Sequence, residues 1–209
     1  MLISRQRKFL FVHIQKTAGT SLVHALKQAF PDTQDFLRPH DPLRFAEQSL
    51  GGEYKDYFKV AFVRNPFERL VSWYTMITAH GVLLTEQQKK ADPSYNKIWQ
   101  YVLSRSNSFE EFVIHCSDAT DRSAWKPFLY NQKDYLVNSN SEVDIDFIGR
   151  FETLDKDVAR LSEDLGAQVS MPHLNPSAHR DYRQYYSAES RGVVERRFAA
   201  DLDYFSYTF

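Results

Sequence analysis

An α/β fold is predicted, with a mostly parallel central sheet flanked by helices in a single domain over residues 1–209. Two segments combine a buried strand, a loop and an amphipathic helix, and a third segment repeats the strand-to-helix order later in the chain. The length of 209 residues is that of one ordinary domain. Strands that alternate with helices are typical of a parallel sheet, whose ligands bind at the carboxyl ends of the strands.

The first strand and helix open the chain. The apolar run FLFVHI at residues 9–14 follows MLISRQRK, and we expect this whole opening to be a strand, because its apolar run is too short for a membrane span and no small-residue cleavage site follows. Leu22, Ala25, Leu26 and Ala29 then recur at helical spacing. Pro31 is expected to end this helix.

The second strand and helix are predicted from YFKVAFV at residues 57–63 and from the segment after it. Pro66 suits the first turn of a helix, and Leu70, Trp73 and Ile77 give that helix an apolar face. Residues 80–142 are expected to form a variable insertion on the acceptor side of the site, with helices at 95–103 and 108–116. A strand within 143–151 and helices at 153–166 and 187–198 complete the prediction.

Composition narrows the functional class. The net charge of −1 argues against a nucleic-acid binder or a protein of anionic membrane surfaces, so any anion site must be local. Cys116 is the single cysteine, which excludes an internal disulfide and a Cys-x-x-Cys zinc site. We expect a cytoplasmic enzyme without a membrane anchor.

The loop QKTAGTS at residues 15–21 follows the first strand and begins the first helix. Gly19 permits close backbone approach, the helix N-terminus attracts anions, and Lys16 adds a compact positive charge. The lysine precedes the glycine, unlike the GxxxxGK[ST] order of nucleotide triphosphatases, which indicates a singly linked anion and no obligatory metal. The alternative interpretation is an ordinary Gly-Thr-Ser turn before a helix.

A second anion-binding side chain, Arg64, ends the second strand. Its guanidinium can hold a phosphate through a fork of donors, and Ser72 can reach the same group only if the following helix folds back beside it. Taken alone, Arg64 is equally well explained as an ion-pair partner of Glu68.

Together the two loops carry a resemblance. HIQKTAGTS and VAFVRNPFERLVSWY resemble the two signature segments of PAPS-dependent carbohydrate sulfotransferases, the group of the Golgi and heparan sulfate enzymes, and DFIGRFETLDKDV is similar to a later segment of that family. The resemblance implies a P-loop-like fold in a soluble member of bacterial type. It also implies a sulfuryl donor, 3′-phosphoadenosine 5′-phosphosulfate (PAPS), a product, PAP, and a carbohydrate hydroxyl as acceptor, with no metal.

The resemblance further assigns roles to individual residues. The 5′-phosphosulfate would be held by the loop residues Lys16, Thr17, Ala18, Gly19, Thr20 and Ser21, with Lys16 at the leaving-group oxygen. Arg64 and Ser72 would bind the 3′-phosphate. His40, in a polar turn with two prolines, is the predicted catalytic base, and Asp41 is the weaker alternative.

The tail and the insertion supply further candidates. Ser177, Arg180 and Arg183 lie in a basic, aromatic loop that is expected to close over the nucleotide, although such a loop is also an ordinary solvated surface. An acidic glycan could meet the basic residues of the insertion, which could equally form a solvated face: Lys89, Lys90, Lys97, Arg105, Arg122 and Lys126.

Two other functional classes stay open at this point. A nucleotide-dependent kinase would keep the same fold but is disfavoured by the order of the lysine and glycine in the first loop. A non-catalytic module that binds nucleotide or glycan would have no need to retain Lys16, Arg64, Ser72 and His40 together.

Overall fold

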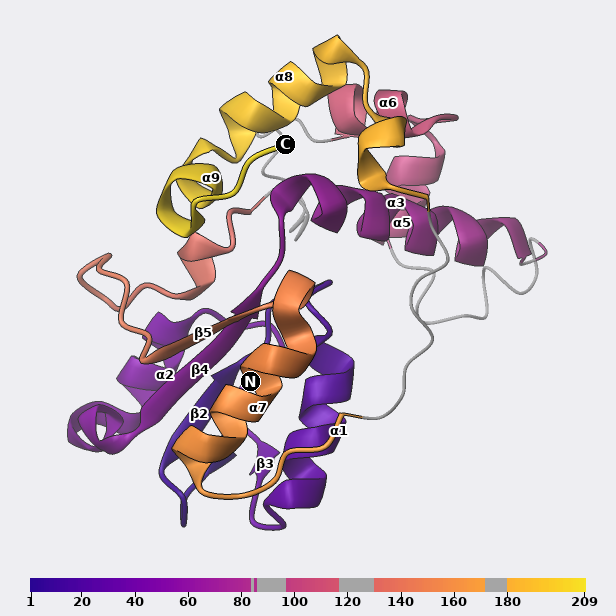
Figure 1. Cartoon of the computed structure of the whole chain (residues 1–209). Coiled ribbons are helices and arrows are strands. Elements are labelled where there is room, and N and C mark those ends of the chain that lie inside the picture. Colours follow the sequence, from indigo (N-terminus) through magenta and orange to yellow (C-terminus); the bar gives the residue numbers. More distant parts are fainter. Residues whose placement is uncertain (84, 86–96, 117–129, 172–179) are drawn as a thin grey trace. The chain divides into compact units, whose positions relative to one another are not determined.

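The computed structural model describes residues 1–83, 85, 97–116, 130–171 and 180–209 (Figure 1). The chain divides into two compact units. Met1–Arg64 and Asn131–Ala178 form the first, which we call the sheet unit, and Asn65–Tyr130 with His179–Phe209 form the second, the helical unit. The prediction of one domain over the whole chain stays a prediction.

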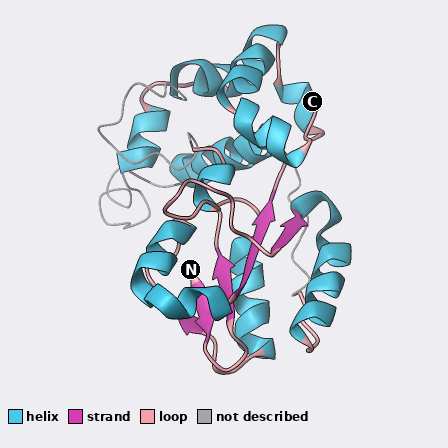
Figure 2. Cartoon of the chain, turned by 90° about the vertical axis from the view of Figure 1, so that its left-hand side faces the viewer, coloured by secondary structure: helices cyan, strands magenta, loops and turns pink. Residues whose placement is uncertain are grey.

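The sheet unit contains a five-stranded sheet in the order β3-β1-β2-β4-β5. Its strands are β1 (Leu2–Ser4), β2 (Phe9–Val12), β3 (Gln34–Asp35), β4 (Phe58–Val63) and β5 (Phe147–Arg150). β4 pairs in parallel with β2 and with β5, whereas β1 is antiparallel to both β2 and β3, so every strand except β1 points the same way. The predicted α/β class with a mostly parallel sheet is confirmed, and Figure 2 shows the strands flanked by helices.

The opening of the chain corrects one prediction. A single strand was expected, but Leu2–Ser4 and Phe9–Val12 form an antiparallel hairpin in which Leu2 pairs with Phe11. The turn contains Lys8 at a positive φ of 52°, a conformation that sequence patterns assign to glycine or asparagine. Asp32 holds the hairpin by accepting hydrogen bonds from the Ser4 hydroxyl at 2.7 Å and the Gln6 N–H at 3.1 Å.

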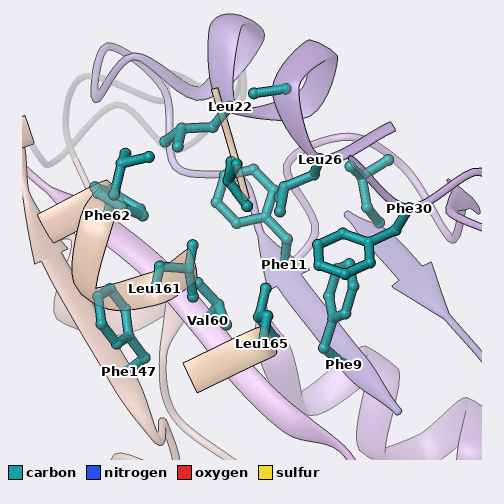
Figure 3. Close-up of a cluster of buried hydrophobic side chains, with 14 residues drawn as sticks. Phe9, Phe11, Leu22, Leu26, Phe30, Val60, Phe62, Phe147, Leu161 and Leu165 are labelled. Carbon is teal, nitrogen blue, oxygen red and sulfur yellow. The ribbon is translucent and has the colours of Figure 1, made fainter. Parts of the chain in front are cut away.

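The core of the sheet unit lies between the sheet and two helices, α1 (Gly19–Ala29) and α7 (Leu154–Leu165). Figure 3 shows the two helices and the strands contributing side chains to one apolar cluster, among them Phe9, Phe11, Leu22, Leu26, Phe30, Val60, Phe62, Phe147, Leu161 and Leu165. The predicted helical stripe of α1 is therefore its buried face. The α7 helix is capped by Gly166, whose φ of 65° suits a glycine.

Shorter helical segments complete the sheet unit. They are α2 (Leu43–Leu50), followed by the 3₁₀ turns η1 (Gly51–Asp56), η4 (Lys133–Tyr135) and η5 (Phe151–Thr153). The sequence did not predict α2, because its eight residues hold only two buried positions, Leu43 and Ala46.

The helical unit confirms the helices expected from periodicity. Its elements are α3 (Pro66–Leu83), α5 (Lys97–Leu103), α6 (Phe109–Glu111), the π-helical η2 (Phe112–Cys116), η6 (Tyr182–Tyr185), α8 (Ala188–Arg197) and α9 (Ala199–Phe205). Ser187 caps α8 through a capping box with Ser190. Trp73 packs in the apolar cluster of this unit. Within the described part of the chain, no helix combines the length and apolar character needed to cross a membrane.

The junction between β5 and α7 depends on a buried carboxylate. Thr153 stands at the N-cap position of α7 but makes no side-chain cap, and its hydroxyl donates to Asp157 at 2.6 Å. Asp157 also accepts the Arg150 N–H at 2.9 Å and pairs with Arg160 at 2.8 Å. The carboxylate therefore joins the end of the strand to the first turns of the helix.

Replacing Asp157 by alanine is expected to lower the free energy of unfolding by about 2–3 kcal/mol, because it removes a buried carboxylate that accepts the partly buried Arg150 N–H and the Thr153 hydroxyl. Asp164→Ala, at an exposed position of the same helix, is the matched control and should change the stability by less than about 0.5 kcal/mol. Urea denaturation of both variants measures the difference, and equal midpoints would contradict this role of Asp157.

Candidate functional site

The loop between β2 and α1 is tightly wound. Lys16 and Ala18 both adopt left-handed backbone conformations, with φ values of 69° and 62°. The Thr17 hydroxyl donates to the Ile14 carbonyl at 2.9 Å, inside the loop. The Ala18 carbonyl accepts the N–H groups of Ser21 and Leu22 and so begins the helix. Non-glycine residues in this conformation are uncommon and concentrate at functional sites.

The first turn of α1 is suited to an anion. It contains no acidic residue, and Ala18 makes no side-chain cap. The first N–H groups of a helix lack intrahelical partners, and the helix dipole adds positive potential there. Thr20 is exposed beside Gly19, whereas Ser21 is buried. These residues could hold a phosphate or sulfonate oxygen.

Gly19 is required by its neighbour His13. A Cβ atom added at Gly19 would lie 1.9 Å from Cδ2 of the His13 ring, so the imidazole occupies the space that any side chain would need. His13 is partly buried and stacks on Phe11 with 6.0 Å between ring centroids. Burial is the main cause that lowers the pKa of His13 to about 3, and the nearby His40 lowers it further. His13 is therefore a neutral support beneath the loop at physiological pH.

The family resemblance implies that this loop holds the phosphate end of PAP. On that basis the substitution Gly19→Ala is expected to weaken PAP binding by at least about tenfold, since the loop must move away from the His13 ring to make room for a methyl group. In a His13→Ala background, the same substitution should cost much less, because the obstructing ring is gone. Calorimetric PAP titrations of the four proteins of this cycle measure the coupling. Equal penalties in both backgrounds would show that the contact does not govern the loop.

Lys16 lies beside Arg64. The guanidinium Nη1 of Arg64 donates to the Lys16 carbonyl at 3.3 Å. Burial lowers the pKa of Lys16 to about 8, and the positive charge of Arg64 contributes in the same direction. The contact follows from the topology, because β2 and β4 are parallel neighbours and Arg64 directly follows β4. Lys16 and Arg64 thus meet at the carboxyl edge of the sheet, a direct contact that the sequence analysis did not predict.

Arg64 is enclosed, with a relative exposure of 2%. Its guanidinium carbon lies 3.8 Å from the centroid of the Phe151 ring. Its main chain is held by Gln132, whose Oε1 accepts the Arg64 N–H at 2.9 Å and whose Nε2 donates to the Arg64 carbonyl at 2.7 Å. Sequence reasoning did not single out Gln132 or Phe151, because no local pattern relates residues so far apart in the chain.

His40 lies on the loop that follows β3. Because β3 and β2 point the same way, this loop and the Lys16 loop leave the same edge of the sheet. The Nδ1 atom of His40 lies 2.9 Å from the His13 carbonyl oxygen, and the two rings meet edge to face at 4.5 Å. A carbonyl can only accept, so Nδ1 carries the proton and Nε2 is the basic nitrogen. Asp41 accepts the Arg38 N–H at 3.0 Å, as expected of a turn residue.

The sheet unit therefore brings together Lys16, Arg64 and His40. Ser72 is buried on α3 in the helical unit, so its joint action with Arg64 stays a prediction. Arg180 is exposed, Arg183 pairs with Asp181 at 3.4 Å, and Ser177 lies outside the described residues. Of the basic residues in the insertion, Arg105 lies 4.2 Å from the Tyr101 ring centroid and Lys97 begins α5. The others lie outside the described residues, namely Lys89, Lys90, Arg122 and Lys126.

Comparison with known families decides between the functional classes. The model of the Sulfotransferase family matches residues 1–208. The chain belongs to the sulfotransferase family. This membership confirms the predicted enzyme class and the P-loop-like fold and disfavours the kinase alternative. Among the residues that the structure describes, no cluster of histidine, cysteine or acidic side chains could hold a metal ion.

Individual sulfotransferases are similar to the chain over most of its length. Carbohydrate sulfotransferase 10 of Xenopus laevis is 27% identical over 99% of this chain and 67% of its own length, and that of Pongo abelii is 23% identical over 99% and 66%. Carbohydrate sulfotransferase 11 of Rattus norvegicus is 29% identical over 54% of this chain and 34% of its own length. The chain thus spans about two thirds or less of these relatives. No solved structure matches it significantly.

Proposed function

We propose that this sulfotransferase moves the sulfuryl group of PAPS to a hydroxyl of a carbohydrate, with Lys16 at the leaving group and His40 as the base. The observation that carries the proposal is the joint position of a partly buried lysine, a helix N-terminus and a histidine whose Nδ1 is hydrogen-bonded, all at one sheet edge. The carbohydrate acceptor is suggested by the names of the relatives, which are carbohydrate sulfotransferases 10 and 11.

The residues of the loop fit the phosphosulfate end of the donor. Gly19 begins α1, whose first main-chain N–H groups have no intrahelical partners, and Lys16 adds the one cation of the QKTAGTS segment. Lys16 stabilises the negative charge that develops on the departing phosphate oxygen, since it is held near that position before the reaction begins. Thr17 and Ala18 shape the loop through the hydroxyl bond to Ile14 and the left-handed backbone.

The acceptor proton is assigned to His40. In the transfer, the bond between sulfur and the bridging phosphate oxygen breaks while a bond forms from sulfur to the acceptor oxygen. Nε2 of His40 takes the proton of that hydroxyl, because Nδ1 is engaged by the His13 carbonyl. The imidazole is thereby oriented before the acceptor arrives.

The 3′-phosphate is assigned to Arg64 and Ser72 through the family resemblance, with Arg180, Arg183 and Ser177 as candidates for closure over the nucleotide. The enclosed guanidinium of Arg64 also points to a second duty within the loop itself.

Transfer of labelled sulfate from PAPS to a panel of neutral and acidic glycans tests the proposal. Labelled glycan that forms in proportion to enzyme and saturates with PAPS is the expected result. The absence of turnover on every glycan, together with the absence of PAP binding, would contradict it.

A further inference from the structure

Gln132 is fully enclosed, with a relative exposure of 0%, yet its side chain is polar and both ends of its amide are used. We propose that Gln132 is a positioning residue for the phosphosulfate loop, which it holds in its working conformation through Arg64. As a statement about catalysis, this inference rests on the proposed function.

The Gln132 amide holds the main chain of Arg64 at both of its polar groups. Oε1 accepts the main-chain N–H of Arg64 at 2.9 Å, and Nε2 donates to the main-chain carbonyl of the same residue at 2.7 Å. One side chain thus replaces the strand partner that Arg64 would have if β4 continued by one residue. Arg64 is fixed at the point where the chain leaves the sheet.

The Arg64 side chain extends from this main chain to the Lys16 loop. From this fixed main chain, the guanidinium packs on Phe151 at 3.8 Å and donates to the Lys16 carbonyl at 3.3 Å. Lys16 has a positive φ of 69°, which a non-glycine residue adopts only where its surroundings enforce it. The bond to the Lys16 carbonyl is a contact that can enforce this conformation.

The positive charge of Arg64 also acts on Lys16. Burial lowers the pKa of Lys16 most, and the positive charge of the Arg64 guanidinium lowers it further. If Gln132 no longer held Arg64, the guanidinium would be free to move away and the Lys16 ammonium would be easier to protonate. A glutamine that only filled space in the core would have no such effect on Lys16.

The test is a titration of Lys16 by NMR in protein labelled at the lysine side chains, with the signal assigned by a Lys16→Arg variant. Gln132→Met should raise the pKa of Lys16 by about half a unit or more, in the same direction as Arg64→Gln. In the double variant, Gln132→Met should add nothing to the effect of Arg64→Gln, because it acts only through that residue. Gln48→Met, at an exposed position of α2, is the matched control and should leave the titration unchanged.

Gln132→Asn serves as a second variant if the methionine variant does not fold. The shorter amide cannot span both main-chain groups, so the pKa should rise in the same direction by a smaller amount. A folded Gln132 variant with the parent titration, or an effect that adds to that of Arg64→Gln, would overturn the inference.

The titration needs neither PAPS nor turnover, so it decides the role of Gln132 even if the proposed function fails. Where the parent does transfer sulfate, the alkaline limb of the pH–rate profile should shift to higher pH in Gln132→Met, because the pKa of Lys16 is raised in that variant. An inactive parent with the expected titrations would reject the proposed function and keep the connection from Gln132 to Lys16.

Discussion

The variant His40→Ala is expected to lower kcat by about 10²–10⁴-fold, the usual contribution of a positioned general base. Its affinity for PAP should stay within about twofold of the parent, since the product carries no acceptor proton for the histidine to take. The expectation follows from the tautomer, in which Nδ1 donates to the His13 carbonyl and Nε2 is the basic nitrogen. Steady-state transfer assays combined with calorimetric PAP binding measure the two effects separately.

His24→Ala is the matched control for this variant, because His24 is exposed on α1 and takes no part in the proposed chemistry. It should retain the parent kcat. A His40→Ala enzyme with the parent turnover would move the base to Asp41 or to another residue and would refute the assignment.

Lys16→Ala is expected to reduce both binding and rate. Loss of a charge-assisted hydrogen bond should weaken PAP affinity by about 10–100-fold, and loss of leaving-group stabilisation should lower kcat by about 10²–10³-fold. The pH dependence gives a sharper signature. Because the pKa of Lys16 is lowered to about 8, the ammonium is present below that pH and is lost as the pH rises through it. PAP affinity should therefore fall above about pH 8.

An arginine at this position stays protonated over the whole range. The variant Lys16→Arg, if it binds PAP, should accordingly lose the decline in affinity between pH 8 and 10. Calorimetric titrations at a series of pH values distinguish the two proteins. The same decline in both would assign it to a group other than Lys16.

The sequence was most informative where one physical cause dominates a short segment. The apolar runs of β2 and β4 and the helical stripe of α1 predicted both the strands and the buried face of the first helix. The hairpin of β1 and β2 was missed because its turn is built from charged residues around Lys8, without glycine or proline. A short amphipathic segment such as α2 carries too few apolar positions to reveal its period.

In the candidate site, too, the features that depend on local sequence were predicted and the features that depend on distant contacts were not. Lys16 and Gly19 could be selected from the sequence because a loop between a strand and a helix has local rules. The reason that Gly19 must be glycine is the His13 ring, which is only evident in three dimensions. Gln132 is hydrogen-bonded to Arg64 although the two residues are far apart in the sequence, and no local sequence pattern predicts such a bond. Nonlocal hydrogen bonds of this kind are the part of the site that sequence reasoning could not supply.

The central claim is that the Lys16 loop and its surroundings bind a 3′-phosphorylated nucleotide without a metal. Calorimetric titration of the parent protein in the presence of EDTA, with PAP, AMP and ATP in turn, tests this claim most directly. PAP is expected to bind most tightly, and added magnesium should change its affinity little. Tighter binding of magnesium–ATP than of PAP would contradict the account and restore the kinase alternative.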